Sequence, residues 1–169
     1  MAKKASFKTG LESPPKVKIG KSVPKFKLEA TGDQLITESE LKDKLTVLFF
    51  YPKDMTPGCT VEGRDFTKLK TKFSRLNTQV FGVSRDSIKS HEKFKDKESY
   101  KIELISDPDE KLCKIFGVMK LKNMYGKQVR GIDRSTFAID EDVKLLKEWR
   151  GVKVPGHAEE VLDYLKTLD

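Results

Sequence analysis

One cysteine of this 169-residue chain follows a turn-rich segment that would place its sulfur at the start of a helix. Residues 52–59 read PKDMTPGC and follow an apolar, aromatic-rich run at residues 45–51. Such a run predicts a strand buried on both faces, so we expect Cys59 where a central strand passes to a helix. The unpaired N–H groups and the dipole of a helix N-terminus favour an anion such as a thiolate. Because the thiolate is the reactive form, Cys59 is a candidate nucleophile.

Other side chains nearby could assist a thiolate at this position. Thr56 could turn its hydroxyl toward the sulfur or toward a bound oxygen. Pro52 stiffens the loop and removes a backbone donor that would hold water. A cation is also needed, and there are two candidates. Lys53 is near in the sequence, and Arg134 begins a later predicted strand from which its guanidinium could reach Cys59.

Alternating strands and helices must position these residues. We expect strands at 45–51, 79–84, 103–106, 135–139 and 143–149, short strands within 16–43, and helices at 60–76, 87–96, 109–116 and 157–168. Ser87 is a typical helix N-cap, and Gly117 is typical of a helix end. This order predicts a single α/β domain with a mixed central sheet flanked by helices. Ligand sites of such sheets form at the carboxyl ends of the strands, where Cys59 is expected.

The composition indicates a soluble, strongly solvated chain, with 37% hydrophobic and 36% charged residues. No apolar run approaches the roughly 18 residues that a membrane span needs, so we expect no membrane partner. No apolar segment follows the basic N-terminus, as it would in a signal peptide. Two cysteines do not make a disulfide framework and suit a reducing compartment. We therefore expect a cytoplasmic protein.

The net charge of +8 comes mostly from the N-terminal end, where the first 30 residues hold eight lysines and two acids. We expect residues 1–16 to form a flexible basic leader and residues 17–169 to form the single domain. The charge also raises a nucleic-acid-binding hypothesis. No binding motif or aromatic platform accompanies the lysines, so we expect no nucleic-acid partner.

Several polar residues admit a structural or a functional interpretation. Glu62, in the first turn of the predicted helix, would interact favourably with the helix dipole or brace an arginine. We place His91 and His157 on exposed helix faces. Together with the cysteines they lack the spacing of metal ligands, and there is no Gly-rich phosphate loop. We expect neither a metal nor another cofactor.

The segments around Cys59 also resemble a known family. The pattern Pro-x-x-x-Thr-x-x-Cys at 52–59 resembles the active-site signature of peroxiredoxins. Its continuation CTVEGRDF, residues 59–66, is similar to the bacterioferritin comigratory protein, or peroxiredoxin Q, branch. The segment RSTFAID, residues 134–140, resembles the arginine strand of that family. The elements agree in order from about Gly20 to the C-terminus.

This resemblance implies a thioredoxin-like fold and a thiol peroxidase that reduces hydrogen peroxide and organic hydroperoxides in antioxidant defence. Cys59 would be the peroxidatic cysteine and would become sulfenic acid. Thr56 would hydrogen-bond the thiolate and the peroxide, Arg134 would hold both by charge, and Pro52 would shield the site. Thioredoxin or another thiol would reduce Cys59 again. We expect a monomer, with a weak dimer as the alternative. The alternative function is a peroxide sensor or redox chaperone without efficient turnover.

The chain departs from the branch at one position. Members of the branch often carry a resolving cysteine five residues after the first, where this chain has Arg64. Two routes therefore stay open. An outside thiol resolves the sulfenic acid, or Cys113 is the resolving residue. Cys113 lies in the predicted helix 109–116, at the edge of an apolar face, where a cysteine usually serves packing.

Overall fold

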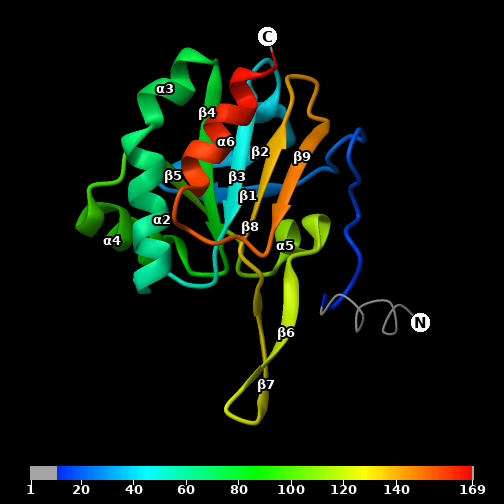
Figure 1. Cartoon of the computed structure of the whole chain (residues 1–169), viewed down its shortest axis with the longest axis vertical. Helices are drawn as coiled ribbons and strands as arrows, with labels where there is room; N and C mark the ends of the chain where they lie inside the picture. Colours follow the sequence, from blue (N-terminus) through cyan, green and yellow to red (C-terminus); the bar gives the residue numbers. More distant parts are fainter. Residues whose placement is uncertain (1–10, 169) are drawn as a thin grey trace.

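A seven-stranded mixed sheet organises the chain, and the computed structural model describes residues 11–168 (Figure 1). The strands are β1 (Lys27–Ala30), β2 (Gln34–Thr37), β3 (Leu45–Phe50), β4 (Thr78–Ser84), β5 (Glu103–Ser106), β6 (Met119–Met124), β7 (Lys127–Ile132), β8 (Ser135–Ile139) and β9 (Leu145–Arg150). The helices are a 3₁₀ turn, η1 (Glu38–Leu41), and α2 (Pro57–Lys68), α3 (Lys70–Arg75), α4 (Ile88–Glu98), α5 (Lys111–Phe116) and α6 (His157–Lys166).

The strand order in the sheet is β2-β1-β5-β4-β3-β8-β9. The three middle strands β5, β4 and β3 are parallel, and the outer neighbours pair antiparallel. The carboxyl ends of β3, β4 and β5 therefore meet at one edge of the sheet, and the amino end of β8 lies at the same edge. The mixed α/β sheet predicted from the sequence is confirmed.

The side chains of β3 alternate between two hydrophobic clusters, one on each face of the sheet. We name them the α5-side cluster and the α2-side cluster. The α5-side cluster includes Leu48, Phe50, Phe81, Val83, Ile105, Leu112, Cys113, Phe116 and Phe137. The α2-side cluster includes Val47, Phe49, Tyr51, Cys59, Phe66, Phe73, Phe94, Tyr100, Leu104 and Val161. Burial on both faces explains why β3 reads as a continuous apolar run.

Two parts of the predicted element order differ from the structure. The single helix expected at 60–76 is two helices, α2 and α3, because Leu69 leaves helical geometry with φ −96° and ψ 2°. The hairpin β6–β7 was not predicted. Its strand β7 is mostly exposed, so it lacks the apolar alternation of a half-buried strand. The one sequence signal was Gly126 in the turn, which follows Tyr125 and, like it, has positive φ.

Residues 11–16 lie against the body of the protein, next to α5 and the hairpin β6–β7. Leu11 pairs with Lys120, and the N–H of Lys16 donates to the carbonyl of Ile115 at 2.9 Å. The carboxylate of Glu12 accepts from Arg130 at 2.6 and 2.8 Å. The predicted leader, 1–16, therefore includes a bound segment, and its first ten residues lie outside the described part of the chain.

The prediction that both histidines are exposed is wrong. His91 is 0% exposed and His157 is 4% exposed. Nε2 of His157 lies 2.7 Å from the hydroxyl of Thr136 in β8, and Nδ1 of His91 lies 2.8 Å from Asp54. These polar partners come from distant segments, so the helix sequences alone give no sign of them.

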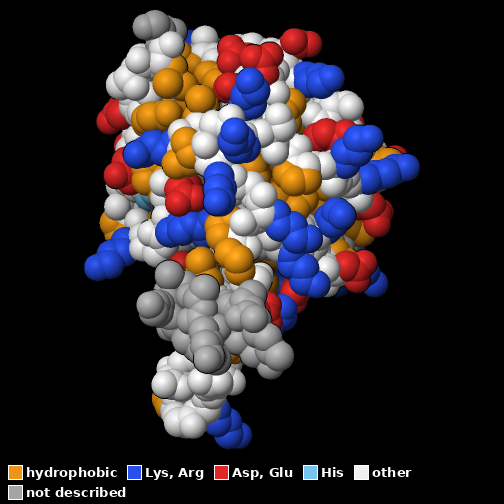
Figure 2. Space-filling view, turned by 90° about the vertical axis from the view of Figure 1, so that its right-hand side faces the viewer, with side chains coloured by type: hydrophobic (Ala, Val, Ile, Leu, Met, Phe, Trp, Pro, Cys, Tyr) orange, Lys and Arg blue, Asp and Glu red, His pale blue; other side chains and the backbone are white. Residues whose placement is uncertain are grey.

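The described surface carries charged side chains of both signs. Figure 2 shows Lys and Arg side chains spread over one face, with Asp and Glu side chains among them. Within residues 11–168, no helix combines the length and the apolar character that crossing a membrane requires.

A close contact fixes α2 against the segment that follows α4. The ring of Tyr100 covers Gly63, and its hydroxyl donates to the carbonyl of Thr60 at 2.9 Å. A Cβ at Gly63 would lie 2.3 Å from the Tyr100 ring, closer than real contacts allow. Because Tyr100 is only 4% exposed, it has little room to move. The glycine therefore sets the distance between α2 and this tyrosine.

We predict that Gly63→Ala destabilises the protein. The better helix propensity of alanine contributes about 1 kcal/mol at most, whereas overpacking of a rigid site costs about 1–3 kcal/mol or more. Urea unfolding should show a net loss of stability. Gly131→Ala is the control, since a Cβ there meets no atom within 4 Å and φ is not positive. Equal stability of the two variants would contradict the prediction.

Candidate active site

Cys59 lies in the first turn of α2, which follows the loop that leaves the carboxyl end of β3. Thr56 is the N-cap with extended backbone geometry, and Pro57 opens the helix with a φ suited to that position. Cys59 is the third helical residue and is 2% exposed. The N–H groups of a first helical turn have no intrahelical partner, so they are available to a negative charge at this sulfur.

Arg134, the residue directly before β8, contacts this sulfur. Ser135 pairs with Phe50 and Ala138 pairs with Val47 in the antiparallel register of β8 and β3. Because side chains alternate along a strand, Arg134 points to the same face as Ala138, which belongs to the α2-side cluster. Its Nη2 donates to Sγ of Cys59 at 3.4 Å. Of the two cations suggested by the sequence, the structure brings Arg134 to Cys59.

Gly58 allows the guanidinium to come this close. A Cβ at Gly58 would lie 3.2 Å from Nη2 of Arg134, tighter than nine in ten real Cβ contacts. The side chain of Lys53, the other candidate, is exposed. The turn-forming residues before Cys59 thus serve both the helix start and the access of its cation.

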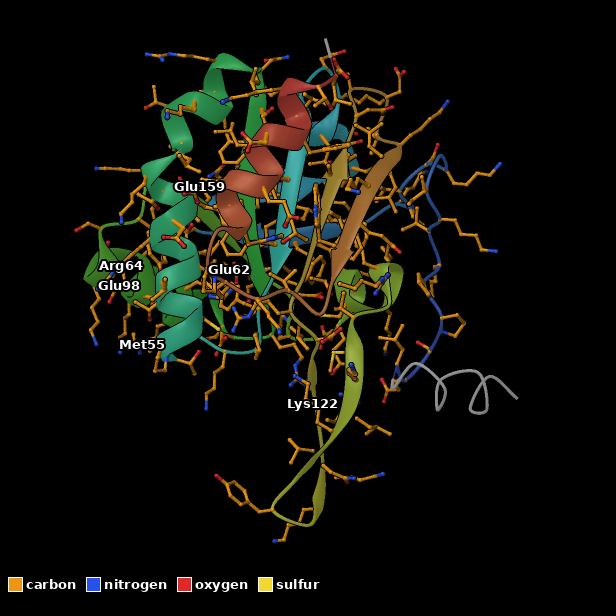
Figure 3. All side chains as sticks on the ribbon, viewed as in Figure 1. Met55, Glu62, Arg64, Glu98, Lys122 and Glu159 are labelled. Atoms are coloured by element: carbon orange, nitrogen blue, oxygen red, sulfur yellow. The ribbon has the colours of Figure 1, made fainter. Side chains whose placement is uncertain are left out.

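Glu62 braces the arginine, one of the two roles that the sequence left open. Its Oε1 accepts from Nη1 of Arg134 at 2.6 Å. Figure 3 shows Glu62 and Arg64 on α2, with Arg64 beside Glu98 and away from Glu62. The guanidinium therefore uses one nitrogen for Glu62 and another for Cys59, a division that its planar fork permits.

Burial and the nearby cation have opposite effects on the charge of Glu62. Burial raises the pKa of Glu62 to about 7, although Arg134 pulls it the other way. Its second oxygen, Oε2, is buried without a hydrogen-bond partner among the described residues. Burial opposes the charge of Arg134 too, but Glu62 and Cys59 together raise its pKa above the ordinary value. Arg134 is therefore a fixed cation, and Glu62 is the group whose charge responds to pH.

Thr56 and Pro52 are in the loop as expected, with contacts of their own. The hydroxyl of Thr56 donates its proton to the carbonyl of Lys53 at 2.9 Å. It must therefore rotate before it can donate to Cys59 or to a bound oxygen. Pro52 is partly buried and follows Tyr51, the buried residue directly after β3. The roles predicted for these two residues stay predictions.

Comparison with known proteins agrees with this arrangement. Residues 19–147 match the model of the AhpC/TSA family. The chain belongs to the AhpC/TSA family. It is 53% identical to Peroxiredoxin Bcp of Xanthomonas campestris over 120 residues, which cover 71% of this chain and 75% of the relative. It is 44% identical to Peroxiredoxin Bcp of Bacillus subtilis over 90% of this chain and 97% of the relative.

Solved structures of this branch share the fold. A crystal structure of a cysteine-to-serine mutant of Xylella fastidiosa PrxQ has a TM-score of 0.85 and 45% identity, over 89% of this chain and 96% of that one. A structure concerned with the alkyl peroxide reduction activity of the Xanthomonas campestris bacterioferritin comigratory protein has a TM-score of 0.83 and 44% identity, over 89% and 96%. The predicted thioredoxin-like fold and membership of the peroxiredoxin Q branch are confirmed.

In this peroxiredoxin the second cysteine lies on the other face of the sheet. Cys113, in α5, belongs to the α5-side cluster, whereas Cys59 belongs to the α2-side cluster. Burial, with the nearby carboxylate of Asp107, raises the pKa of the Cys113 thiol. Cys113 is 0% exposed, and both cysteines are free. A disulfide between them would require a large rearrangement of the sheet or its helices.

Arg64 fills the position where this branch often has a resolving cysteine. Its guanidinium pairs with Glu98 of α4, with N···O distances of 2.9 and 2.6 Å (Figure 3). The Arg64 side chain is 56% exposed, and that of Glu98 is 8% exposed. Because position 64 is an arginine, α2 holds no second cysteine that could form a disulfide with Cys59.

We predict that Glu62 makes stability fall with rising pH. Its folded pKa lies above its unfolded value, so the folded state binds more protons between about pH 4.5 and pH 7. The Glu62 contribution is therefore most favourable below this window and is lost as the pH rises through it, by up to about 3–4 kcal/mol. Urea unfolding of Glu62→Gln across this window should show a smaller decline than the wild type.

The control for this experiment is Glu141→Gln, which changes an exposed glutamate in the turn before β9. Its pH profile should run parallel to that of the wild type. A Glu62→Gln profile that also runs parallel would contradict the assignment.

Proposed function

We propose that this protein is a thiol-dependent peroxidase that reduces hydrogen peroxide and organic hydroperoxides through Cys59. The observation that carries the proposal is the contact of Arg134 with the sulfur of Cys59 at a helix start, with the guanidinium braced by Glu62. Membership of the peroxiredoxin family supports it, as does the alkyl peroxide reduction activity named for the Xanthomonas relative.

In the first step, the thiolate of Cys59 attacks the nearer oxygen of the peroxide. A sulfur–oxygen bond forms, the oxygen–oxygen bond breaks, and the leaving hydroxide or alkoxide takes up a proton. The products are Cys59 sulfenic acid and water or an alcohol. Negative charge moves from sulfur to the leaving oxygen, so the fixed charge of Arg134 and the helix N–H groups stabilise the transition state. Thr56 would add its hydroxyl after rotation, and Pro52 would limit water.

In the second step, an outside thiol reduces the sulfenic acid. One thiol displaces water and forms a mixed disulfide with Cys59, and a second thiol releases the reduced enzyme and an external disulfide. The location of Cys113 on the opposite face favours this one-cysteine route over an internal disulfide. We propose thioredoxin or a small thiol as the reductant, and a monomer in the reducing cytosol as the working form.

We predict that Cys59→Ser abolishes steady-state peroxide consumption driven by the thioredoxin system or dithiothreitol. Serine lacks a nucleophile of comparable acidity, so no sulfenic acid forms. Cys113→Ser is the matched control and should keep near wild-type turnover. Peroxide turnover in the Cys59→Ser variant would contradict the proposal. Stalling of the Cys113 variant, with a disulfide between the two cysteines in the wild type by mass spectrometry, would make Cys113 the resolving residue.

We also predict that Arg134→Ala slows the reaction of Cys59 with peroxide by more than about tenfold, or 1.4 kcal/mol. Arg134→Lys should recover only part of the rate, because an ammonium lacks the fork that joins Glu62 and Cys59. Arg64→Ala is the control, since it removes an exposed arginine from the same region. Single-turnover rates with hydrogen peroxide measure this step. An unchanged rate in Arg134→Ala would remove this residue from the site.

A further inference from the structure

A second set of buried polar side chains lies in and next to the active-site loop. These side chains make no contact with Cys59 in the described structure. Asp54 is in the loop between β3 and α2, and His91 is in α4. Their side chains are 2% and 0% exposed. Nδ1 of His91 lies 2.8 Å from Oδ2 of Asp54, and 37 residues separate the two in the chain.

Three donors converge on the carboxylate of Asp54. The hydroxyl of Tyr51 donates to Oδ1 at 2.6 Å, and the hydroxyl of Ser90 donates to Oδ2 at 2.7 Å. The ring of His91 supplies the third. The backbone N–H of Asp54 also donates to Oδ2 of Asp86 at 2.9 Å. One residue thus ties the active-site loop to the end of β3, to the segment after β4 and to α4.

The hydrogen-bond partners determine where the protons lie. Nε2 of His91 is 2.9 Å from the carbonyl oxygen of Ile105, which can only accept, so Nε2 carries a proton. Nδ1 faces a carboxylate oxygen, so a second proton lies between Nδ1 and Asp54. The pair is therefore neutral as a whole, and both ring nitrogens of His91 and both carboxylate oxygens of Asp54 are hydrogen bonded. Such pairing makes the burial of two ionisable groups tolerable.

The same atoms do not form a ready metal site. Asp54, Asp86 and His91 offer ligand atoms within 4.8 Å of one another. Donors already occupy them, since Oδ2 of Asp86 also accepts from the hydroxyl of Ser84 at 2.5 Å. A cation would have to displace these protons. The contacts therefore favour a hydrogen-bonded latch, by which we mean Tyr51, Asp54, Ser90 and His91.

The latch is connected to Cys59 through a strained residue. Met55, which follows Asp54, has φ 63°, in the left-handed region that L-residues rarely adopt. Such a conformation is unfavourable for a residue with a Cβ, so it persists only where neighbouring contacts hold it. Asp54 is fixed on one side of Met55, and the N-cap Thr56 lies on the other. The hold on Asp54 thereby sets where α2 begins.

We propose that Asp54 and His91 are positioning residues, whose pair holds loop 52–56 so that Cys59 lies against Arg134. This inference rests on the proposed peroxidase function. A small peroxide can react with Cys59 in this closed conformation, although the sulfur is only 2% exposed. The latch therefore favours the oxidation of Cys59, the half-reaction that uses the contact with Arg134, and is not needed for the reduction of Cys59 by an outside thiol.

The two half-reactions separate this role from a general loss of stability. In single-turnover experiments, Asp54→Ala should lower the rate of Cys59 oxidation by hydrogen peroxide by more than about tenfold. The rate at which dithiothreitol reduces oxidised Cys59 should not fall. Asp54→Asn should restore oxidation to within about threefold of the wild type, because an amide can donate to Nδ1 of a neutral His91 and accept from Tyr51.

The control is Ile36→Ala in β2, a buried residue of the α5-side cluster, which lowers stability without touching the loop. It should leave both half-reactions unchanged. Ser90→Ala, which removes one of the three donors, should reproduce the pattern of Asp54→Ala to a smaller extent, and it serves where the alanine variant does not fold. Equal losses in both half-reactions, or no loss in either, would overturn the proposal.

Hydrogen exchange keeps this test separate from the proposed function. Amides of residues 52–58 should exchange faster in Asp54→Ala than in the wild type, and Asp54→Asn should restore their protection. If the wild type consumes no peroxide, the proposed function fails, while this local change still supports the latch. Unchanged exchange in this segment of Asp54→Ala overturns the latch, whatever the peroxidase assay gives.

Discussion

The antiparallel pairing of β8 with β3 is the constraint on which the active site depends. It brings the first residue of β8 opposite the last residue of β3 and so places Arg134 at the edge where the Cys59 loop leaves the sheet. The two-residue period of a strand then directs the guanidinium to the α2 face. A shift of register by one residue would turn it toward the α5 face, away from the sulfur.

Around this contact, the site holds the charged groups Arg134 and Glu62 where burial disfavours their charged forms. Arg134 interacts with two partners, Cys59 and Glu62, and the second oxygen of Glu62 has no hydrogen-bond partner among the described residues. A buried ion pair of this kind is weak evidence for stability, because desolvation offsets much of the attraction. The ion pair instead fixes the orientation of the Arg134 guanidinium. A braced guanidinium presents a fixed donor to the sulfur without reorganising during the reaction.

The two cysteines illustrate how the environment decides the chemistry of a side chain. Both are buried, yet they face opposite sides of the sheet. Cys59 lies at a helix start beside a cation, whereas Cys113 packs among Leu112 and Phe116, and its thiol has a raised pKa. The thiol that we propose as the nucleophile and the structural thiol therefore lie on opposite faces of the same sheet.

The sequence by itself determined the central strand, the helix start at Cys59 and the chemistry expected there, because these depend on local features. An aromatic run, two prolines and a glycine specify strand, turn and helix within about a dozen residues. It also pointed to Arg134 through the resemblance of its strand. The hairpin β6–β7 stayed hidden, because an exposed strand shows no apolar alternation.

Only the tertiary structure decided the rest, since it depends on partners far apart in the chain. His91 reads as an exposed helix residue until Asp54 and Ile105 meet it in the core. Glu62 had two plausible roles until Arg134 reached it from 72 residues away. The faces of Cys59 and Cys113 likewise follow from strand order and register. These are properties of packing, and no local pattern in the sequence encodes them.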